Sequence, residues 1–299
     1  MISPPYLKAG DKIGVVSTAK RTTPEEIEHG LDLLKSWGLV PVLGKNIYNT
    51  HGFFAGTDEE RLQDIQQMLD DDSLKAITFT KGAYGTLRII KNIDLTRFRE
   101  RPKWIAGYSD ITALHYNINK LGIQSIHAVM LQGMPTSNFA AAETLRAALF
   151  GEQLSYSIPR DPNNNTDNPV SGTLTGGNLS MLYALLDSDS DPTGNILFFE
   201  DIDEYLYHFD RMIVTLKNRG KLEWLKAILV GGLIEIKEST IPFGQNAREI
   251  VLQHAKSYGL PVYFGFPSGH MSDNRALILG RTVHIKPTGA MVEVSFADQ

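Results

Sequence analysis

The sequence contains no cysteine among its 299 residues. This absence excludes disulfide bonds, zinc sites with thiolate ligands and a cysteine nucleophile. The sequence also lacks a strong excess of either charge. It has 29 Lys and Arg and 34 Asp and Glu, a formal net charge of -5, and no run of basic residues. Proteins that bind nucleic acid through its phosphates need a basic patch, so we expect no nucleic-acid partner.

Long hydrophobic runs are missing as well. No apolar run approaches the roughly 18 residues that a membrane-spanning helix requires, and the first eight residues lack the apolar core of a signal peptide. We therefore expect no membrane association and a cytoplasmic location.

Motifs for phosphate and metal binding are absent too. The glycine-rich segment 81–86 does not match G-x-G-x-x-G, and no G-K-[ST] follows it as in a P-loop. Acidic residues are dense at 200–204, but no pair of histidines lies near them in the sequence. We expect no metal and no cofactor.

What the sequence does contain is an alternation of apolar strands and amphipathic helices. Strands are predicted at 12–17, 40–43, 76–80, 104–106 and 126–130. Helices begin at Thr23-Pro24 and at Thr57, where Glu60 completes a capping box. This alternation predicts a parallel sheet covered by helices on both faces, a Rossmann-like N-terminal α/β domain at residues 1–155.

A polar segment at 160–169, with two prolines and four asparagines, is the strongest loop signal in the chain. It places a linker at 156–169 and a C-terminal domain at 170–299. Strands are predicted in that domain at 170–175, 195–201, 227–232, 261–266, 275–279, 283–286 and 291–296. The fold class is therefore α/β, with a mixed, β-rich α/β domain following the parallel one.

Ser109 stands between the strand at 104–106 and a predicted helix at 111–118. A serine on such a strand-to-helix turn exposes its hydroxyl beside unpaired helical N–H groups, where a nucleophile can work. Serine and aspartate are also the usual helix N-caps, so Ser109 and Asp110 have a purely structural alternative. If Ser109 is a nucleophile, the N–H of Asp110 and an N–H from the 81–86 loop supply an oxyanion hole.

Two more residues with catalytic chemistry leave the ends of apolar strands. Glu200 lies either at the rim of the sheet, where it would orient a histidine, or in a solvated acidic loop. His270 follows Gly269 in a loop, where a general base would stand. Ser109, Glu200 and His270 together supply a nucleophile, an orienting carboxylate and a base. The same order occurs in α/β-hydrolases, but the second glycine of their G-x-S-x-G elbow is missing here.

Six short motifs in this order resemble the LD-carboxypeptidases, serine peptidases of the S66 type that also include the microcin C self-immunity peptidases. The motifs lie at 7–16, 81–85, 107–112, 176–179, 199–201 with 210–211, and 269–270. The resemblance covers nearly the whole chain. It implies two domains with the active site between them, a homodimer, and neither metal nor cofactor.

The resemblance also implies the roles of individual residues. The triad would be Ser109, Glu200 and His270, with Glu204 as an alternative to Glu200. The oxyanion hole would use backbone N–H groups of Asp110, Gly82 and Ala83. Lys81, Tyr84 and Asn178 are the candidate substrate-binding residues, although the position of Asn178 before a helix at 180–186 also fits an N-cap.

The chain departs from the family at one loop, which usually reads Arg-Gly-Gly-Tyr-Gly and here has Lys81 and Ala83. Since the oxyanion hole uses backbone N–H, we expect Ala83 to keep that role if its φ stays negative. Lys81 lacks the planar fork of arginine, which weakens a bidentate contact to a substrate carboxylate.

The implied activity is hydrolysis of the L,D-peptide bond before the terminal D-alanine of murein tetrapeptides, in cell-wall peptide recycling. Two alternatives remain. One is a microcin C-type hydrolase of a peptide–nucleotide conjugate, which needs an aromatic clamp for the base. The other is a non-catalytic ligand-binding protein of the same fold, in which Ser109 is only a cap.

Overall fold

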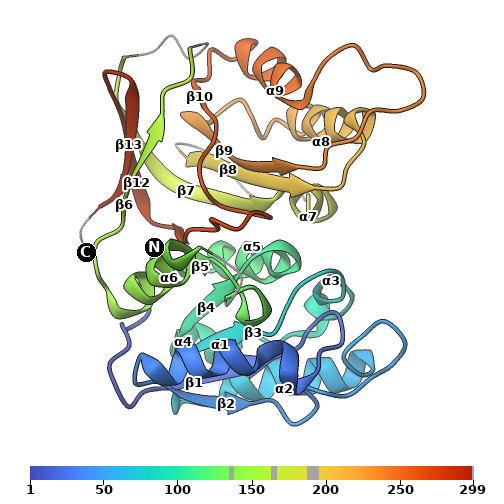
Figure 1. The fold of residues 1–299 in the computed structure, drawn as a ribbon, viewed down its shortest axis with the longest axis vertical. Coiled ribbons are helices and arrows are strands. Elements are labelled where there is room, and N and C mark those ends of the chain that lie inside the picture. The colour runs from blue at the N-terminus through green and yellow to red at the C-terminus, as the bar shows by residue number, and fades with distance from the viewer. Residues whose placement is uncertain (135–137, 163–166, 187–194, 298–299) are drawn as a thin grey trace. The chain divides into compact units, whose positions relative to one another are not determined.

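The computed structural model describes residues 1–134, 138–162, 167–186 and 195–297 of the chain. The backbone forms two compact units (Figure 1). Unit 1 comprises Met1–Gln153 and Ser272–Ile278, and unit 2 comprises Leu154–Met271 and Leu279–Gln299.

This division differs in two places from the domains expected from the sequence. The expected linker at 156–169 begins with a strand, β6 (Ser155–Pro159), whose Tyr156 and Ile158 are buried at alternate positions. Segment 272–278 returns to unit 1. The polar composition downstream of β6 concealed this short strand, and residues 163–166 of the expected linker lie outside the described residues.

Within the described residues, unit 1 is built on a six-stranded sheet in the order β11-β5-β4-β3-β1-β2. Its strands are β1 (Lys12–Val16), β2 (Val40–Leu43), β3 (Leu74–Phe79), β4 (Trp104–Gly107), β5 (Ser125–His127) and β11 (Leu277–Leu279). The neighbouring pairs from β2 through β5 are parallel. Ile13, Ile77 and Ile105 are fully buried, as residues of a parallel sheet covered on both faces must be. The predicted α/β fold of this half is confirmed.

The helices of unit 1 begin largely where the sequence places them. They are α1 (Pro24–Ser36), α2 (Asp58–Asp70), α3 (Thr86–Ile89), α4 (Thr96–Glu100), α5 (Thr112–Lys120) and α6 (Phe139–Phe150), with 3-10 turns η1 (Ile90–Asn92), η2 (Ser109–Ile111) and η3 (Leu131–Gly133). The capping box predicted at Thr57 forms, and the helix predicted to begin at Thr23-Pro24 also has a capping box, which was not predicted from the sequence. The strand predicted at 126–130 ends at His127, because the buried run that continues to Met130 leaves the sheet.

Unit 2 carries a sheet whose described strands follow the order β10-β9-β8-β7-β12-β13-β6. The pairs from β10 through β7 are parallel and those from β7 through β6 are antiparallel. Besides β6, the strands are β7 (Val170–Asn178), β8 (Asn195–Ile202), β9 (Ala227–Ile234), β10 (Val262–Tyr263), β12 (Thr282–Thr288) and β13 (Met291–Phe296). The helices are α7 (Leu179–Ala184), α8 (Leu206–Asn218) and α9 (Ala247–Lys256). The predicted mixed, β-rich half is confirmed.

The strand predicted at 261–266 is shorter than expected. It ends at Tyr263, and Gly265 then adopts a φ of 77°, a left-handed conformation that breaks the extended backbone. This early end leaves residues 264–270 as a loop at the carboxyl end of β10.

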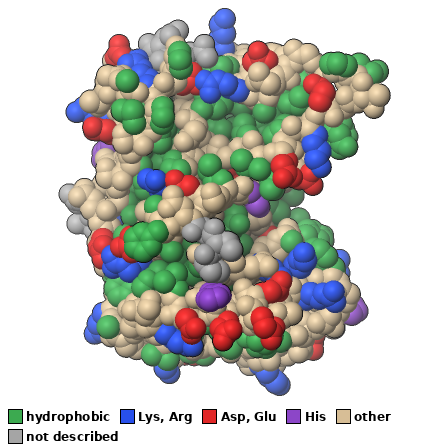
Figure 2. All heavy atoms as spheres, viewed as in Figure 1, with side chains coloured by type: hydrophobic (Ala, Val, Ile, Leu, Met, Phe, Trp, Pro, Cys, Tyr) green, Lys and Arg blue, Asp and Glu red, His purple; other side chains and the backbone are tan. Residues whose placement is uncertain are grey.

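No helix in the described part of the chain is both long and apolar enough to cross a membrane. Acidic and basic side chains are interspersed with apolar ones on the visible face of each unit (Figure 2).

Candidate active site

Ser109 lies two residues after Gly107, the last residue of β4, and begins η2, and its own backbone is strained. Its φ is 60°, in the left-handed region that a non-glycine residue rarely occupies. At Gly107, two residues earlier, a side chain would be tight, because a Cβ there would lie 3.0 Å from Ile111 Cγ1 and 3.1 Å from Phe79 Cδ2. The chain therefore makes a sharp strand-to-helix turn without the second glycine of the G-x-S-x-G motif.

The capping alternative for this turn does not hold for the helix that follows. The N-cap of η2 is Tyr108 and that of α5 is Ile111, and neither makes a side-chain cap bond. Left-handed backbone at non-glycine residues costs of the order of 1–3 kcal/mol and collects at functional sites. The conformation of Ser109 thus supports a role beyond capping.

The glycine-rich loop after β3 packs directly against Ser109. A Cβ on Gly82 would lie 3.3 Å from Ser109 Cβ and 3.4 Å from its Oγ. Because Gly82 has no side chain, the backbone of the loop itself lies next to the Ser109 hydroxyl. Ala83 has a φ of 86°, not the negative value expected. The position favours glycine, the residue that the family pattern has there, and Ala83 occupies it under strain.

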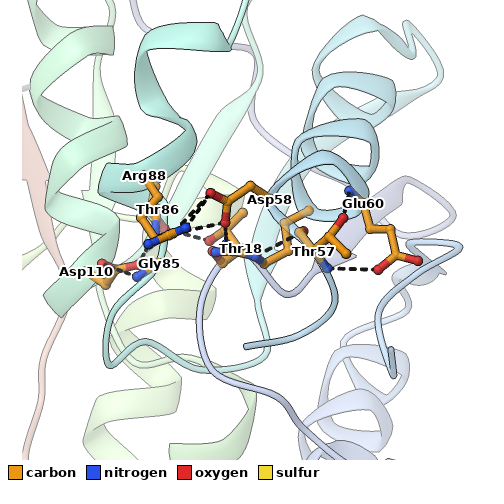
Figure 3. Close-up of polar contacts among 9 residues, drawn as sticks. Thr18, Thr57, Asp58, Glu60, Gly85, Thr86, Arg88 and Asp110 are labelled. Atoms are coloured by element: carbon orange, nitrogen blue, oxygen red, sulfur yellow. Dashed lines mark hydrogen bonds and ion pairs between the residues drawn. The ribbon is translucent and has the colours of Figure 1, made fainter. Parts of the chain in front are cut away.

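The carboxylate of Asp110 makes two hydrogen bonds to backbone N–H groups, although we expected only the backbone N–H of this residue to have a role. It accepts hydrogen bonds from the N–H groups of Gly85 (3.2 Å) and Thr86 (2.9 Å) at the start of α3 (Figure 3). The side chain of Asp110 therefore connects the Ser109 turn to the loop above it.

Two candidate substrate-binding residues of unit 1 have partners within the unit. Lys81 is buried, and its Nζ lies 2.7 Å from Glu26 Oε2. Tyr84 is 45% exposed, and its ring lies 6.1 Å from that of Phe54. Lys81 would have to share its charge with Glu26 to bind a substrate carboxylate, whereas Tyr84 offers an exposed ring.

In unit 2, Glu200 and His270 are hydrogen-bonded to each other. The Nδ1 atom of His270 lies 2.7 Å from Glu200 Oε2, and the same oxygen accepts the backbone N–H of His270 (3.2 Å). Glu200 is fully buried, not at the rim or in the solvated loop that the sequence suggested. The acidic residues after β8 had concealed this burial.

Two glycines make this close approach possible. At Gly269, where φ is 112°, a Cβ would lie 2.6 Å from Glu200 Oε2. At Gly231 on β9, a Cβ would lie 2.5 Å from the carbonyl oxygen of Ser268 and 3.1 Å from Glu200 Cβ. A glycine is therefore needed before His270, because any side chain at position 269 would overlap Glu200.

Asn178 fixes the other oxygen of Glu200. Its Nδ2 donates to Glu200 Oε1 (3.2 Å) and to Asp201 Oδ1 (3.0 Å), while its Oδ1 accepts the N–H of Met181. The capping role that the sequence allowed for Asn178 is therefore observed. Its amide also holds two neighbouring carboxylates, which the sequence did not reveal.

Asp201 and Glu204 belong to the same hydrogen-bonded chain but not to the His270 contact. Asp201 accepts bonds from the N–H and hydroxyl of Ser180 (2.9 and 2.8 Å), and burial raises its pKa to about 6. Glu204 pairs with His208 and accepts the Ser180 hydroxyl (3.0 Å). This geometry supports Glu200, and not Glu204, as the partner of His270.

The surroundings of His270 favour its protonated form. Burial lowers the pKa of His270, but the hydrogen bond to Glu200 and the negative charges of Glu200 and Asp201 raise it, and the net pKa lies above the ordinary value. A histidine in this position accepts a proton readily and holds it while a charged intermediate exists.

The described residues contain no group of three or more His, Asp or Glu side chains arranged to hold a metal ion. Sequence reasoning missed the residues that support the site. In unit 1 these are Arg61, Thr18 and Thr86, and in unit 2 Ser180 and Asp201. Their contacts join segments far apart in the chain, so no local motif marks them.

Comparison with known proteins matches both halves of the chain to one family. Residues 13–128 match the LD-carboxypeptidase N-terminal domain, and residues 171–285 match the LD-carboxypeptidase C-terminal domain. This chain belongs to the LD-carboxypeptidase family. The resemblance inferred from the six motifs is thereby confirmed, and the family is one of serine-type peptidases, which are hydrolases.

Among similar proteins, the probable murein peptide carboxypeptidase of Bacillus subtilis (strain 168) is 34% identical over 288 residues, covering 93% of this chain and 89% of the relative. A muramoyltetrapeptide carboxypeptidase from Oxalobacter formigenes has a TM-score of 0.85 at 24% identity, covering 96% of this chain and 99% of the other. The microcin C7 self-immunity protein MccF in complex with aspartyl sulfamoyl adenosine has a TM-score of 0.87 at 23% identity, covering 100% and 99%. The two structures share the fold of this LD-carboxypeptidase family member.

Proposed function

We propose that this protein is a serine-type LD-carboxypeptidase that removes the terminal D-alanine from murein tetrapeptides. The single observation that carries the mechanism is the left-handed backbone of Ser109, with the Gly82 loop packed on its hydroxyl. The substrate follows from the names of the relatives, above all the probable murein peptide carboxypeptidase at 34% identity.

In this mechanism the Glu200–His270 pair activates Ser109. An ionised carboxylate only accepts hydrogen bonds, so the proton between the two lies on His270 Nδ1 and leaves a lone pair on Nε2. His270 Nε2 takes the proton of Ser109 as Oγ attacks the carbonyl carbon of the L,D-peptide bond. The charge that develops on the carbonyl oxygen is bound by the N–H of Asp110 and by an N–H of Gly82 or Ala83.

The second half of the cycle uses the same groups in reverse. The C–N bond breaks, His270 gives its proton to the amine of D-alanine, and an ester remains on Ser109. Water then transfers a proton to His270 Nε2 and attacks the ester carbonyl. The bond between that carbon and Oγ breaks, His270 returns the proton to Oγ, and the tripeptide is released as its carboxylic acid. No metal is needed at any step, because the carbonyl is polarised by backbone donors.

A second candidate substrate is an aminoacyl or peptidyl nucleotide conjugate. It is favoured by an exposed aromatic surface beside the Gly82 loop, where Phe53 and Tyr84 are each 45% exposed and flank the ring of Phe54 at 5.4 and 6.1 Å. Rings with open faces stack on nucleobases. The fold of the microcin C7 self-immunity protein agrees equally with this alternative.

The test is a direct comparison of substrates with the purified protein. Release of D-alanine from a murein tetrapeptide is measured beside the same peptide ending in L-alanine and beside aspartyl sulfamoyl adenosine. The proposal expects the highest kcat/KM on the D-alanine peptide, and none of these activities in Ser109→Ala. A higher kcat/KM on the nucleoside conjugate would favour the second candidate. Stoichiometric peptide binding without turnover would favour the non-catalytic alternative.

The proposal includes a homodimer, as the family resemblance implies, and a cytoplasmic location, as expected from the sequence. Light scattering on the eluting protein measures its mass, and a mass of 33.2 kDa, that of a single chain, would contradict the dimer. Fractionation of cells that produce the protein tests the location.

A further inference from the structure

The side chain of Asp110 joins two segments that the proposed oxyanion hole requires. Its carboxylate binds the N–H groups of Gly85 and Thr86, which end the loop that begins with Gly82 (Figure 3). Asp110 is also the residue directly after Ser109. One short, buried side chain therefore spans from the nucleophile turn to the loop on the other side of the hydroxyl.

Because the Asp110 carboxylate is buried, losing its hydrogen bonds to Gly85 and Thr86 would be costly. Asp110 is only 1% exposed, and burial raises its pKa, while the bonds from Thr86 and Gly85 and the positive charge of Arg61 lower it in part. A buried carboxylate is costly unless hydrogen bonds replace its water. The loop N–H groups supply that replacement, so moving the loop away would expose the carboxylate to a large desolvation cost.

The loop is held from its opposite side as well. The hydroxyls of Thr86 and Thr18 lie 2.7 Å apart, and Arg61 donates from Nη1 to the carbonyl oxygen of Thr18 (2.7 Å). A Cβ on Gly85 would lie 2.5 Å from Arg61 Nη1 and 2.6 Å from Ala19 Cα. Gly85 is thus wedged between Arg61 and the segment after β1, and the Asp110 bonds close the remaining side.

We propose that the Asp110 carboxylate is a positioning residue for the oxyanion hole. The contact formed by Asp110, Gly85 and Thr86, here named the Asp110 clasp, fixes the N–H groups of Gly82 and Ala83 relative to Ser109. It also holds the left-handed backbone of Ala83 and Ser109, whose φ values are 86° and 60°. Donors of an oxyanion hole act only when they are held in place beforehand. This inference rests on the proposed function, and it gives Asp110 a second task beside its own N–H.

The test compares Asp110→Asn with wild type. The amide keeps one oxygen acceptor but turns an NH₂ group toward Gly85 or Thr86, which breaks half of the clasp without changing its size. We expect kcat to fall about tenfold to a hundredfold, less than the roughly hundredfold to thousandfold loss when an oxyanion donor is removed outright. KM on the D-alanine tetrapeptide should stay within about threefold, because the clasp acts on the transition state.

A second readout separates positioning from general damage. A tripeptide boronic acid forms a tetrahedral adduct with serine and uses the oxyanion hole, so its inhibition constant should weaken by the same factor as kcat. The pH dependence that belongs to His270 should not move, because its pKa is set by Glu200 and Asp201 within unit 2, whereas the clasp consists of unit 1 residues.

Asp64→Asn is the matched control. Asp64 is also buried in unit 1, with a pKa raised by burial, and it accepts the N–H and the Nδ2 of Asn46 (2.8 and 2.9 Å). Its loss should lower stability in a similar way but leave kcat and boronate affinity unchanged. A milder variant, Thr18→Val, removes only the Thr18–Thr86 bond and should lower kcat a few fold with the same loss of boronate affinity.

The outcomes distinguish the two proposals. If wild type does not release D-alanine, or Ser109→Ala retains the activity, the proposed function fails and the inference fails with it. If wild type is active and Asp110→Asn equals Asp64→Asn in kcat and boronate affinity, only the clasp is overturned. Should Asp110→Asn fail to fold, Thr18→Val decides, and wild-type kcat with wild-type boronate affinity there would contradict the clasp.

Discussion

The residues of the proposed triad are held by different physical means in the two units. In unit 1 the position of Ser109 depends on backbone: a left-handed φ, a loop packed on the hydroxyl, and a carboxylate that binds loop N–H groups. In unit 2 the Glu200–His270 contact depends on charge: two side chains 2.7 Å apart, an amide on the second oxygen, and a raised histidine pKa.

The two halves should therefore be sensitive to different kinds of substitution. The unit 1 half should respond to changes of shape and backbone freedom, and the unit 2 half to changes of charge and pH. Glycines are needed in both, but for different neighbours. At Gly107 a side chain would press on the apolar side chains of Ile111 and Phe79, whereas at Gly269 it would overlap the carboxylate of Glu200.

The largest effect is expected in unit 1, from Ser109→Ala. It removes the nucleophile, so kcat should fall by about 10³-fold or more, with KM nearly unchanged, because the groups of a triad act as a unit. D-alanine release from the tetrapeptide measures it. Ser36→Ala, at an exposed position on α1, is the control and should keep wild-type kcat. Activity in Ser109→Ala within tenfold of wild type would end the nucleophile assignment.

In unit 2, Glu200→Gln should come next. The glutamine no longer holds the proton on Nδ1 or stabilises the charged ring, so kcat should fall about a hundredfold to ten-thousandfold. Glu204→Gln is the matched control, since Glu204 contacts His208 and Ser180 instead. If Glu204→Gln lost more activity than Glu200→Gln, the orienting carboxylate would be Glu204.

Gly269→Ala tests the packing that brings His270 to Glu200. A Cβ there would overlap Glu200 at 2.6 Å, so kcat should fall about a hundredfold, as for displacements near 1 Å. Gly265→Ala is the control, because its φ of 77° is also left-handed but its Cβ would meet nothing within 4 Å. Backbone strain should cost each variant about 1–2 kcal/mol of unfolding free energy, and Gly269→Ala should lose more because of the overlap with Glu200. Equal kcat in the two would remove the special role of Gly269.

The pH dependence of kcat/KM should distinguish the halves by charge. Activity requires neutral His270, so kcat/KM should rise with pH through the His270 pKa, with a midpoint above the ordinary value. In Glu200→Gln the bonded negative partner is lost, and only the charge of Asp201 still opposes the effect of burial on the ring, so the midpoint should move to lower pH. Burial raises the pKa of Asp201 to about 6, so its titration could be mistaken for that of His270. Asp201→Asn removes this carboxyl group, and the rise of kcat/KM with pH that belongs to His270 should remain in that variant. A midpoint that stays fixed in Glu200→Gln would show that another group controls activity.

The smallest effect is expected from Ala83→Gly, in unit 1. Glycine relieves the strain at a φ of 86°, worth about 1–2 kcal/mol, but frees the unfolded chain, which offsets about half of it. Chemical denaturation should therefore show an unfolding free energy equal to wild type or higher by about 1 kcal/mol, with kcat within about twofold. A clear loss of stability would mean that Ala83 is not strained.

The sequence predicted most of the fold because its signals are local. The capping box at Thr57, the Thr23-Pro24 helix start and apolar strands such as 12–17 each depend on residues a few positions apart. The candidate triad followed from strand ends in the same way. Two elements were misjudged where burial, not strand pairing, explains an apolar run: the segment after His127 and the end of β10 at Gly265.

The supporting contacts could not be predicted from local patterns. Nothing near Asp110 in the sequence indicates that its carboxylate binds Gly85, and nothing near Asp201 indicates its burial. Both contacts join segments that lie more than twenty residues apart. The φ of Ala83 was misjudged for a similar reason, because the loop conformation is set by Asp110 and Arg61 and not by its own residues.

The central claim is that Ser109 is the nucleophile, and labelling with a fluorophosphonate tests it most directly. Activity should fall in proportion to one covalent adduct per chain, peptide mapping should place the adduct on Ser109, and His270→Ala should slow its formation. Complete loss of activity with the adduct on another residue, or full activity with Ser109 modified, would contradict the account.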